Sequence, residues 1–291
     1  MRDDFCIFIL THGRPDNLKT LKTLEKCGYS GRLYLVIDDE DKTANEYKSK
    51  YGDMVLQFSK EEIESRIDPG DNFQDRRTIL HARNACFDLA KKVGVKYFMQ
   101  LDDDYTSFHL RFGSDGKAMH PRVNKMDDLL SCILDFFVVT PALSVAIAQG
   151  GDYLGGCIGT QRSLRRKAMN TFICSVDRPF KFRSTFNEDV ATYTTLSRQG
   201  HLFFTVMQAQ VVQLQTQSNE GGITELYKRF GTYVKSFSTI MHCPSSVQVG
   251  TIGDHRSPHY RIHHKINWHK TAPKILRDEH KKSVCQSATS V

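Results

Sequence analysis

A chain of 291 residues with 40% hydrophobic and 25% charged residues can bury a sizeable core, which excludes a disordered or low-complexity protein. A formal net charge of +7 permits a polyanionic partner without requiring one. Eight cysteines without a C-x-x-C pair argue against a disulfide framework or a zinc cluster and indicate free thiols in a reducing compartment.

The chain begins with an apolar run, FCIFIL (5–10), which predicts a strand covered on both faces. This run is too short for a signal peptide, and acids stand where basic residues would be expected. The turn THGRPDN (11–17) follows, and Asp16 can help to start a helix over about 16–27. The next predicted strand, 32–37, ends in the acidic sequence DDED.

Strands and helices continue to alternate through the first third of the chain. We expect a helix near 43–51, a strand over 54–58, a polar loop over 59–77 that could order over a ligand, a helix over 77–93 and a strand over 95–101. This alternation predicts an α/β fold with a Rossmann-type, mostly parallel sheet flanked by helices. Ligands bind such sheets beyond the carboxyl ends of the strands.

The second half of the chain is less regular. A helix is expected near 126–139, another over 189–199 that ends at Gly200, and a third over 222–240, while HLFFTV and QVVQLQ predict two strands. The longest apolar stretch, 133–148, is too short and too interrupted to span a membrane. We therefore expect a cytoplasmic protein without a membrane segment.

Three consecutive aspartates, Asp102 to Asp104, follow the strand predicted over 95–101. Along an extended chain Asp102 and Asp104 point to one side and Asp103 points to the other. Adjacent carboxylates repel one another unless a positive charge neutralises them. Grouped oxygen ligands suit Mg²⁺ or Mn²⁺, which proteins bind through one or two carboxylates plus substrate phosphates. The triplet predicts a metal site that holds a diphosphate, and a solvated surface turn is the alternative.

The order of these features resembles a known family. An apolar strand, T-x-x-R-P, a helix, a strand ending in acids and Q-L-D-D-D are similar to the nucleotide-sugar domain of GT-A glycosyltransferases. More narrowly, they resemble the TET-associated glycosyltransferase family, known from phages and related to the glucosyltransferase of base J synthesis. The matching segments span nearly the whole chain: FILTHGRPDNLKTLKTLEKCGYSGRLYLVIDDED, HARNACFDLAKKVGVKYFMQLDDDYTSF, GGITELYKRFGTYVKSFSTIMHCPSS and YRIHHKINWHKTAPKI.

The resemblance implies a GT-A fold and a metal-dependent glycosyltransferase. The expected reaction moves a hexosyl or pentosyl group from a nucleotide-sugar to the hydroxyl of a 5-hydroxymethylpyrimidine, 5-hydroxymethylcytosine first, in DNA. UDP-glucose is the default donor and Mn²⁺ or Mg²⁺ the expected cofactor, and a phage-encoded enzyme would act in the host cytoplasm. Residues 1–110 would form the nucleotide-sugar-binding half, and residues 111–291 the acceptor-binding and catalytic half of the same domain.

Carried over by position, the resemblance assigns residues to the donor site. Thr11 and Arg14 would line the nucleotide pocket, and one of the acids after the second strand would receive the uracil or ribose. Simpler alternatives are that the arginines are salt-bridge partners and that those acids form a solvated turn. The donor-site residues implied are Thr11, Arg14, Asp38, Asp39, Asp41, Arg83, Asn84 and Asp103, with Asp102 and Asp104 as metal ligands.

An acidic pair stands before the helix predicted over 189–199, in the tripeptide N-E-D. If configuration inverts, the acceptor hydroxyl must be activated, and a carboxylate within hydrogen-bond reach is the usual general base. Inverting GT-A enzymes often place an acidic pair here, so Asp189 is favoured as the base, with Glu188 next. Asp189 could instead cap its helix, and a retaining mechanism would need no base at this place.

Four histidines lie close together in HYRIHHKINWH, residues 259–269. Zinc is disfavoured because no cysteine is nearby and the stretch alternates like a strand, which gives no helical face to pair the rings. GT-A enzymes often supply one late histidine to the metal, so His263 or His264 is expected in that role. The alternative is a polar surface or a contact to the diphosphate.

Two basic stretches, residues 161–183 and 265–282, could bind the phosphates of a DNA acceptor. In the first, Phe172, Phe180 and Phe182 alternate with cations and could stack on an unpaired base. A solvated basic face is the plainer alternative, and a GT-A enzyme acting on protein, lipid or glycan, or a catalytically silent DNA-binding module, are the competing functions. The cations expected to contact DNA are Arg162, Arg165, Arg166, Lys167, Lys265 and Lys270.

Overall fold

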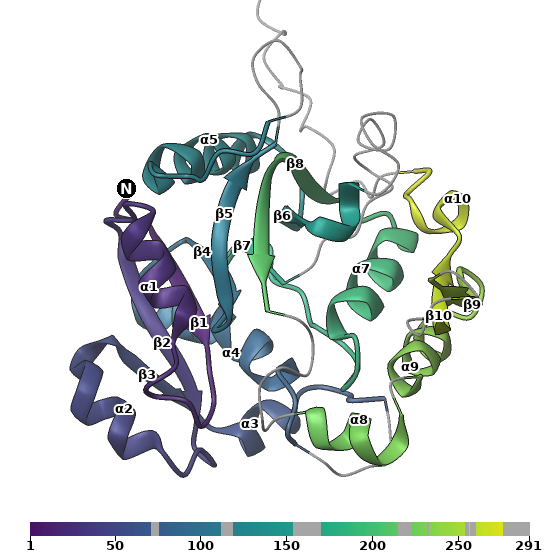
Figure 1. The fold of residues 1–291 in the computed structure, drawn as a ribbon, viewed down its shortest axis with the longest axis horizontal. Coiled ribbons are helices and arrows are strands. Elements are labelled where there is room, and N and C mark those ends of the chain that lie inside the picture. The colour runs from purple at the N-terminus through teal and green to yellow at the C-terminus, as the bar shows by residue number, and fades with distance from the viewer. Residues whose placement is uncertain are drawn as a thin grey trace, which may run out of the picture.

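One eight-stranded sheet organises the protein, in the order β3-β2-β1-β4-β7-β6-β8-β5 (Figure 1). The computed structural model describes residues 1–70, 76–111, 119–153, 170–214, 223–231, 233–253, 256 and 260–275. The strands are β1 (Phe5–Leu10), β2 (Arg32–Asp38), β3 (Val55–Phe58), β4 (Tyr97–Asp102), β5 (Tyr105–Leu110), β6 (Ser144–Gln149), β7 (Ile173–Ser175) and β8 (Phe203–Gln213). The pairs β3–β2, β2–β1, β1–β4 and β6–β8 are parallel, whereas β7 and β5 run antiparallel to their neighbours. The expected α/β fold with a mostly parallel sheet is confirmed.

Helices cover both faces of this sheet. They are α1 (Lys19–Lys26), α2 (Ala44–Tyr51), α3 (Lys60–Glu64), α4 (Leu80–Lys92), α5 (Met126–Val139), α7 (Glu188–Arg198), α8 (Thr224–Phe230), α9 (Val234–His242) and α10 (Trp268–Thr271). In the part of the chain described here, no helix is long and apolar enough to cross a membrane.

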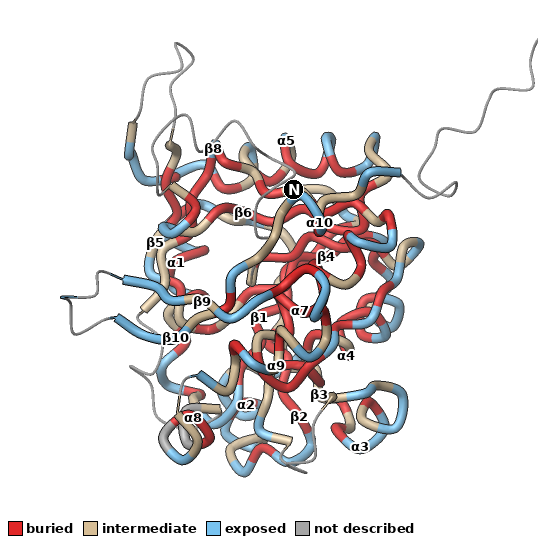
Figure 2. Tube along the Cα trace, turned by 90° about the vertical axis from the view of Figure 1, so that its right-hand side faces the viewer, coloured by how far each residue is buried: buried red, intermediate tan, exposed pale blue. Residues whose placement is uncertain are grey.

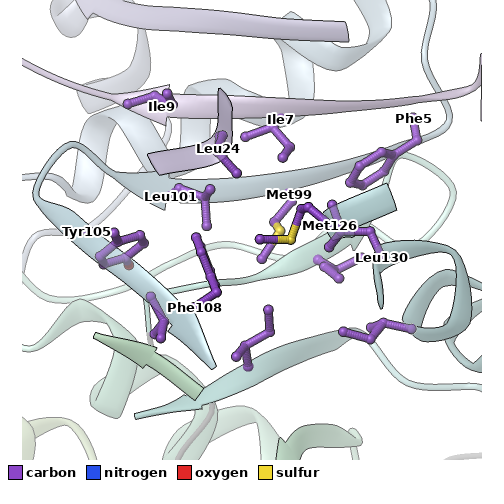
Figure 3. Packing of buried hydrophobic residues seen from close by; sticks show 14 of the residues in the cluster. Phe5, Ile7, Ile9, Leu24, Met99, Leu101, Tyr105, Phe108, Met126 and Leu130 are labelled. Carbon is purple, nitrogen blue, oxygen red and sulfur yellow. The ribbon is translucent and has the colours of Figure 1, made fainter. Parts of the chain in front are cut away.

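The central strand β1 explains why its sequence is a continuous apolar run. Alternate residues of a strand point to opposite faces, and every residue of β1 is buried. Ile7 and Ile9 pack on one face with Leu24 of α1 and residues of α5 (Figure 3). Cys6 and Phe8 pack on the other face with residues of α4 and α7. Figure 2 shows this buried centre as a continuous band between exposed outer turns.

A separate two-stranded antiparallel ribbon, β9 (Val247–Ile252) with β10 (Arg261–Ile266), stands outside the main sheet. Its nearest helix is α9, which contacts both strands. Figure 1 places α9 and the ribbon beside α7, on the side of the molecule away from α1 and α2.

Three elements differ from the sequence-based expectation. The helix expected over 222–240 is two helices, α8 and α9, because the chain turns at Gly231 with φ +80°, a conformation that favours glycine. The two strands expected near 203 and 210 are one long strand, β8. The polar loop expected over 59–77 contains α3, whose Ser59 side chain accepts a hydrogen bond from Glu62 N and so caps the first turn.

The cysteines behave as expected in the described part of the chain. Cys6, Cys27, Cys86, Cys132, Cys174 and Cys243 are all free. The two functional halves predicted for residues 1–110 and 111–291 share the one sheet, since β6, β7 and β8 complete it after β1 to β5. The division of labour between them stays a prediction.

Candidate active site

A cavity of about 330 Å³ opens at the carboxyl ends of β1, β2 and β4. This is the edge at which parallel sheets of this kind bind ligands. The residues that line it come from the turn after β1, the end of β2, the end of β3 with the start of α3, the aspartate triplet at the end of β4, the segment around the start of α4, the start of α7, and α8. They are Leu10, Thr11, His12, Arg14, Asp38, Phe58, Lys60, Arg77, Thr78, Ile79, Ala82, Asp102, Asp103, Asp104, Thr185, Asn187, Glu188, Ile223 and Tyr227.

Asp103 is held by the turn that follows β1. The Thr11 hydroxyl donates to Asp103 Oδ2 at 2.8 Å, and Arg14 NH1 lies 3.1 Å from Asp103 Oδ1. Burial raises the pKa of Asp103, although Arg14 and the Thr11 hydrogen bond oppose that rise. Asp103 therefore fixes the predicted nucleotide-binding residues Thr11 and Arg14 against the end of β4.

Asp102 shares a buried arginine with Glu188. Arg83 is fully buried, its NH2 group donates to Asp102 Oδ1 at 3.0 Å, and its Nε donates to Glu188 Oε1 at 2.8 Å. Burial raises the pKa of Asp102 to about 7, although the Arg83 guanidinium opposes it. The alternative in which Arg83 pairs with a nearby acid is the one observed, and Arg83 itself does not line the cavity. It instead holds the two cavity-lining carboxylates in place.

Asp104 differs from its two neighbours, because its Oδ1 atom is buried and has no hydrogen-bond partner among the described residues. Burial and the neighbouring Asp103 carboxylate raise the pKa of Asp104 to about 6. A buried carboxylate oxygen without a donor fits a cation ligand. No group of three His, Cys, Asp or Glu residues that could hold a metal occurs in the described part. Two carboxylates plus substrate phosphates are nevertheless the usual set for Mg²⁺, so Asp102 and Asp104 fit the expected ion.

Asp38 is the one of the three acids predicted after β2 that faces the cavity. His12 Nδ1 lies 2.7 Å from Asp38 Oδ2, and Lys60 Nζ lies 3.0 Å from Asp38 Oδ1. Burial would raise the pKa of Asp38, but the His12 hydrogen bond and the Lys60 ammonium outweigh it and lower that pKa to about 2. Asp38 is therefore an anionic acceptor pointing into the site.

The other two acids do structural work and do not line the cavity. Asp39 Oδ1 accepts a hydrogen bond from the backbone N of Lys60 at 2.9 Å. Asp41 accepts from Gly13 N and from Thr43 N, each at 2.8 Å, which ties the turn after β1 to the start of α2. The expectation that either one receives the nucleotide is not supported by their positions.

We expect the acid sensitivity of the fold to reflect Asp38. A folded pKa of about 2 against an ordinary value of 3.8 contributes roughly 2 kcal/mol. This stability is present above pH 3.8 and is lost as pH falls through about 2. Asp38→Asn should therefore unfold more easily than wild type at pH 5, and the gap should narrow steadily toward pH 2.5 in denaturation curves. A gap that stays constant with pH would contradict this.

His12 adds a contribution of opposite pH dependence. The Asp38 hydrogen bond raises the pKa of His12 above 6.5, so its contribution is present below 6.5 and is lost as pH rises through the raised value. The Asp38–His12 pair therefore stabilises the fold most between pH 3.8 and pH 6.5, where Asp38 is ionised and His12 is protonated.

Asn84 does not line the cavity, contrary to expectation. Its side chain donates to Phe182 O at 3.2 Å and accepts from Phe182 N at 3.0 Å, and it also donates to Leu80 O. The side-chain amide holds the segment that leads to α7 and makes one further hydrogen bond inside α4. This placement could not be predicted because Phe182 lies 98 positions along the chain.

Glu188, rather than Asp189, faces the cavity at the start of α7. The helix begins at Glu188 after Asn187, whose φ of 51° is in the left-handed region, where asparagine is tolerated. The Asp189 Oδ1 atom accepts a hydrogen bond from Val190 N at 2.7 Å. The geometry thus reverses the expected ranking of the two acids, and Asp189 interacts with the first turn of its own helix.

His263 and His264 lie on β10 and do not line the cavity. His264 is buried, and its Nδ1 lies 3.3 Å from Nδ2 of Asn187, which does line the cavity. The His263 ring lies beside that of His264, with ring centroids 4.1 Å apart and the planes tilted by 31°. The expectation that one of them binds the metal is therefore not supported, and His264 reaches the site only through Asn187.

The expected acceptor surface is only partly visible. Arg162, Arg165, Arg166 and Lys167 lie outside the described residues, whereas Lys265 and Lys270 are exposed. The proposal that phenylalanines stack on a base is wrong, because these rings are in the core, where they pack against one another and against Phe87 and Phe203. The rings concerned are Phe172, Phe180 and Phe182.

Several cavity residues were missed from the sequence. His12 could have been found, because it stands between Thr11 and Arg14 in the turn after a buried strand. Lys60 carried no signal, since a buried lysine beside an acid 22 positions away is visible only in the fold. Tyr227 lies on α8, in a stretch that the sequence predicts as part of one long helix, and this prediction gave no sign that Tyr227 faces the cavity.

Comparisons with known proteins give one family match. A sequence model of the TET-associated glycosyltransferase family matches residues 5–222. No curated protein matches the chain. Among solved structures, it is similar to glucosyl-3-phosphoglycerate synthase from Mycobacterium tuberculosis in complex with Mg²⁺ and UDP, at 10% identity and a TM-score of 0.45, over 90% of this chain and 87% of that one. It is also similar to that enzyme in complex with Mn²⁺ and UDP-glucose, at 9% identity and a TM-score of 0.46, over 89% and 85%.

Proposed function

Because this chain belongs to the TET-associated glycosyltransferase family, we propose that it moves a sugar from a nucleotide-sugar to the hydroxyl of a 5-hydroxymethylpyrimidine in DNA. UDP-glucose is the default donor and 5-hydroxymethylcytosine the default acceptor base. The observation that carries the proposal is the set of three consecutive carboxylates in one cavity. Asp102 and Asp103 each face an arginine, and Asp104 keeps a buried oxygen without a partner in the described part.

On the donor side, the nucleotide would bind along the turn after β1. Asp38 can accept hydrogen bonds from a ribose or a uracil N–H, and Arg14 can approach a phosphate. Asp102 and Asp104 would hold Mn²⁺ or Mg²⁺, which would neutralise charge on the departing diphosphate. Arg83 would hold Asp102 in position through its hydrogen bond, and its positive charge opposes the rise that burial causes in the pKa of Asp102.

On the acceptor side, Glu188 is the proposed general base for an inverting reaction. The acceptor oxygen forms a bond to the anomeric carbon of the sugar while the bond from that carbon to the diphosphate oxygen breaks. The proton of the acceptor hydroxyl passes to a Glu188 carboxylate oxygen. Arg83 holds Oε1 of Glu188, so it fixes the direction in which the carboxylate faces.

Glu188→Gln and Asp189→Asn should separate the two acids. Removing the base is expected to lower turnover on hydroxymethylated duplex DNA by roughly a hundredfold or more, while donor binding stays near wild type. Asp189→Asn keeps an oxygen for the first turn of α7 and should turn over normally. The measurement is turnover beside a thermal melting curve for both variants. Normal turnover by both would remove the base from this site and favour a retaining mechanism.

The function itself is tested by an acceptor panel. The enzyme is incubated with Mn²⁺, labelled nucleotide-sugars and duplex DNA with or without 5-hydroxymethylcytosine, beside protein and glycan acceptors. We expect label only in hydroxymethylated DNA. Label in protein or glycan and none in DNA would replace the DNA acceptor with one of those classes.

A further inference from the structure

Near Val247 and His264, the β9–β10 ribbon has one face against the protein and one face toward solvent. In an antiparallel pair, opposite residues share a face, and neighbours along a strand alternate between faces. Val247 and His264 lie on the inner face and are buried. Arg261 and Lys265 lie on the outer face and are exposed, four positions apart on β10. Figure 2 shows the ribbon extending from the body as mostly exposed strands.

The outer face of the ribbon is basic and carries no compensating acid. Residues 247–253 and 260–266 include no Asp or Glu. Within the described ranges, neither Arg261 nor Lys265 has a carboxylate at ion-pair distance. Lys270 of α10 adds a further exposed cation just beyond the ribbon. This face is therefore suited to a polyanion.

Apolar side chains are exposed at the outer end of the ribbon, where Ile252 shares the face of Arg261, and Val249, Tyr260 and Ile262 lie on the opposite face. Val249, Ile252, Tyr260 and Ile262 are each between 40% and 55% exposed. Apolar groups exposed together mark a surface that a partner covers. Cations with adjacent apolar groups are the combination that contacts phosphates and base edges in a DNA groove.

The inner face of the ribbon connects this surface to the cavity. His264 of β10 hydrogen-bonds Asn187, and the Asn187 side chain also donates to Lys235 O and Thr239 Oγ1 of α9. Asn187 lines the cavity and immediately precedes Glu188. The ribbon is thus anchored, through its inner face, to the residue that precedes Glu188.

We propose that the β9–β10 ribbon binds the duplex that carries the acceptor base, with Arg261 and Lys265 on its phosphates. The proposal rests on the proposed DNA acceptor. A two-stranded ribbon fits the major groove of B-DNA, which is about 12 Å wide, and Arg261 and Lys265 are about 13 Å apart along an extended strand. A 5-methyl substituent of a pyrimidine lies in that same groove, so the ribbon would grip the groove that displays the hydroxymethyl group.

The test compares two charge-matched double variants of the full chain. Arg261→Gln/Lys265→Gln removes the ribbon cations. Lys22→Gln/Lys26→Gln removes two exposed cations from α1, on the opposite side of the molecule (Figure 1). Binding to a hydroxymethylated and to an unmodified duplex is measured by fluorescence anisotropy from low to moderate salt. Sugar transfer is measured on the duplex and on free 5-hydroxymethyl-2′-deoxycytidine.

We expect the ribbon variant to lose roughly tenfold in duplex affinity and to show a salt slope smaller by about 1.8, since each phosphate contact contributes about 0.9. Its kcat/KM should fall on the duplex and remain unchanged on the nucleoside, whereas the α1 variant should match wild type throughout. If wild type transfers to DNA and the ribbon variant matches the α1 variant, the ribbon proposal is wrong and the proposed function stands.

The remaining outcomes separate the two proposals. If wild type binds duplex through the ribbon cations but labels neither duplex nor nucleoside, the ribbon proposal stands and the hydroxymethyl acceptor is wrong. If wild type binds no duplex, the ribbon proposal fails. If the ribbon substitutions instead convert a dimer into a monomer in light scattering without changing duplex affinity, the ribbon is an interface between copies of the chain and the DNA assignment is overturned.

Discussion

Asp104→Asn is expected to abolish sugar transfer while leaving the protein folded. Asp104 Oδ1 is buried without a hydrogen-bond partner among the described residues, and the nearby Asp103 carboxylate repels the ionised form. Removing this charge therefore relieves repulsion in the fold, and the melting temperature should be equal to or above that of wild type. The substitution removes a charged ligand from the proposed ion. Several kcal/mol of transition-state stabilisation would be lost with it, which corresponds to about a thousandfold or more in turnover.

The matched control for this substitution is Asp53→Asn. Asp53 is exposed between α2 and β3 and does not line the cavity, so its neutralisation should leave turnover and melting unchanged. Turnover is measured at saturating donor and Mn²⁺, and wild type is also assayed in excess EDTA. Full activity of wild type in EDTA, or normal turnover by Asp104→Asn, would show that Asp104 does not bind a metal ion needed for transfer.

Arg83→Met should cost the fold about 3–5 kcal/mol, because the substitution leaves two largely buried carboxylates without their cation. Methionine can fill much of the volume against Phe172 and Phe182, over which the guanidinium now lies at 5.3 and 5.8 Å. The loss should therefore come from charge rather than from a cavity. Transfer should fall as well, since both Asp102 and Glu188 lose the group that orients them. Denaturant unfolding gives the free energy.

Two companions make the charge explanation testable. Arg66→Met removes an arginine with two exposed carboxylate partners, Glu62 and Asp88, and should cost less than about 1 kcal/mol. Glu188→Gln introduced into Arg83→Met should recover part of the lost stability, because one uncompensated charge is removed. A loss of 1 kcal/mol or less for Arg83→Met, or no recovery in the double variant, would show that the buried charges are not what Arg83 stabilises.

The parts of the site that could be predicted are those encoded locally. The run FCIFIL, the turn after it and the aspartate triplet each combine a strand end with polar residues in one short segment. Parallel pairing of β1 with β2 and β4 then brings those strand ends together. The hydrophobic periodicity and composition of these segments are enough to predict this arrangement, because the carboxyl ends of all parallel strands lie at the same edge of the sheet.

The pairings inside the site could not be predicted, because they join distant positions. Arg83 lies 19 positions from Asp102 and 105 from Glu188. The ranking of Glu188 and Asp189 was wrong for another reason. Which of the two acids faces the cavity depends on the residue at which α7 begins, and helix ends are the least certain feature of a sequence pattern. Phe172 and Phe182 were predicted to stack on a base because basic residues surround them in the sequence, but both side chains are buried in the core.

The position of β7 limits how this enzyme can be taken apart or recombined. Strand β4, which ends in the aspartate triplet, pairs with β1 on one side and with β7, residues 173–175, on the other. A fragment ending near residue 110 would leave the apolar β4 as an open edge, the kind of edge that aggregates. Chimaeras that exchange whole halves between relatives would disrupt the pairing of β4 with β7. On the role proposed for the β9–β10 ribbon, new acceptor specificity is better grafted there, since in the described part of the chain the ribbon shares no strand pairing with the sheet.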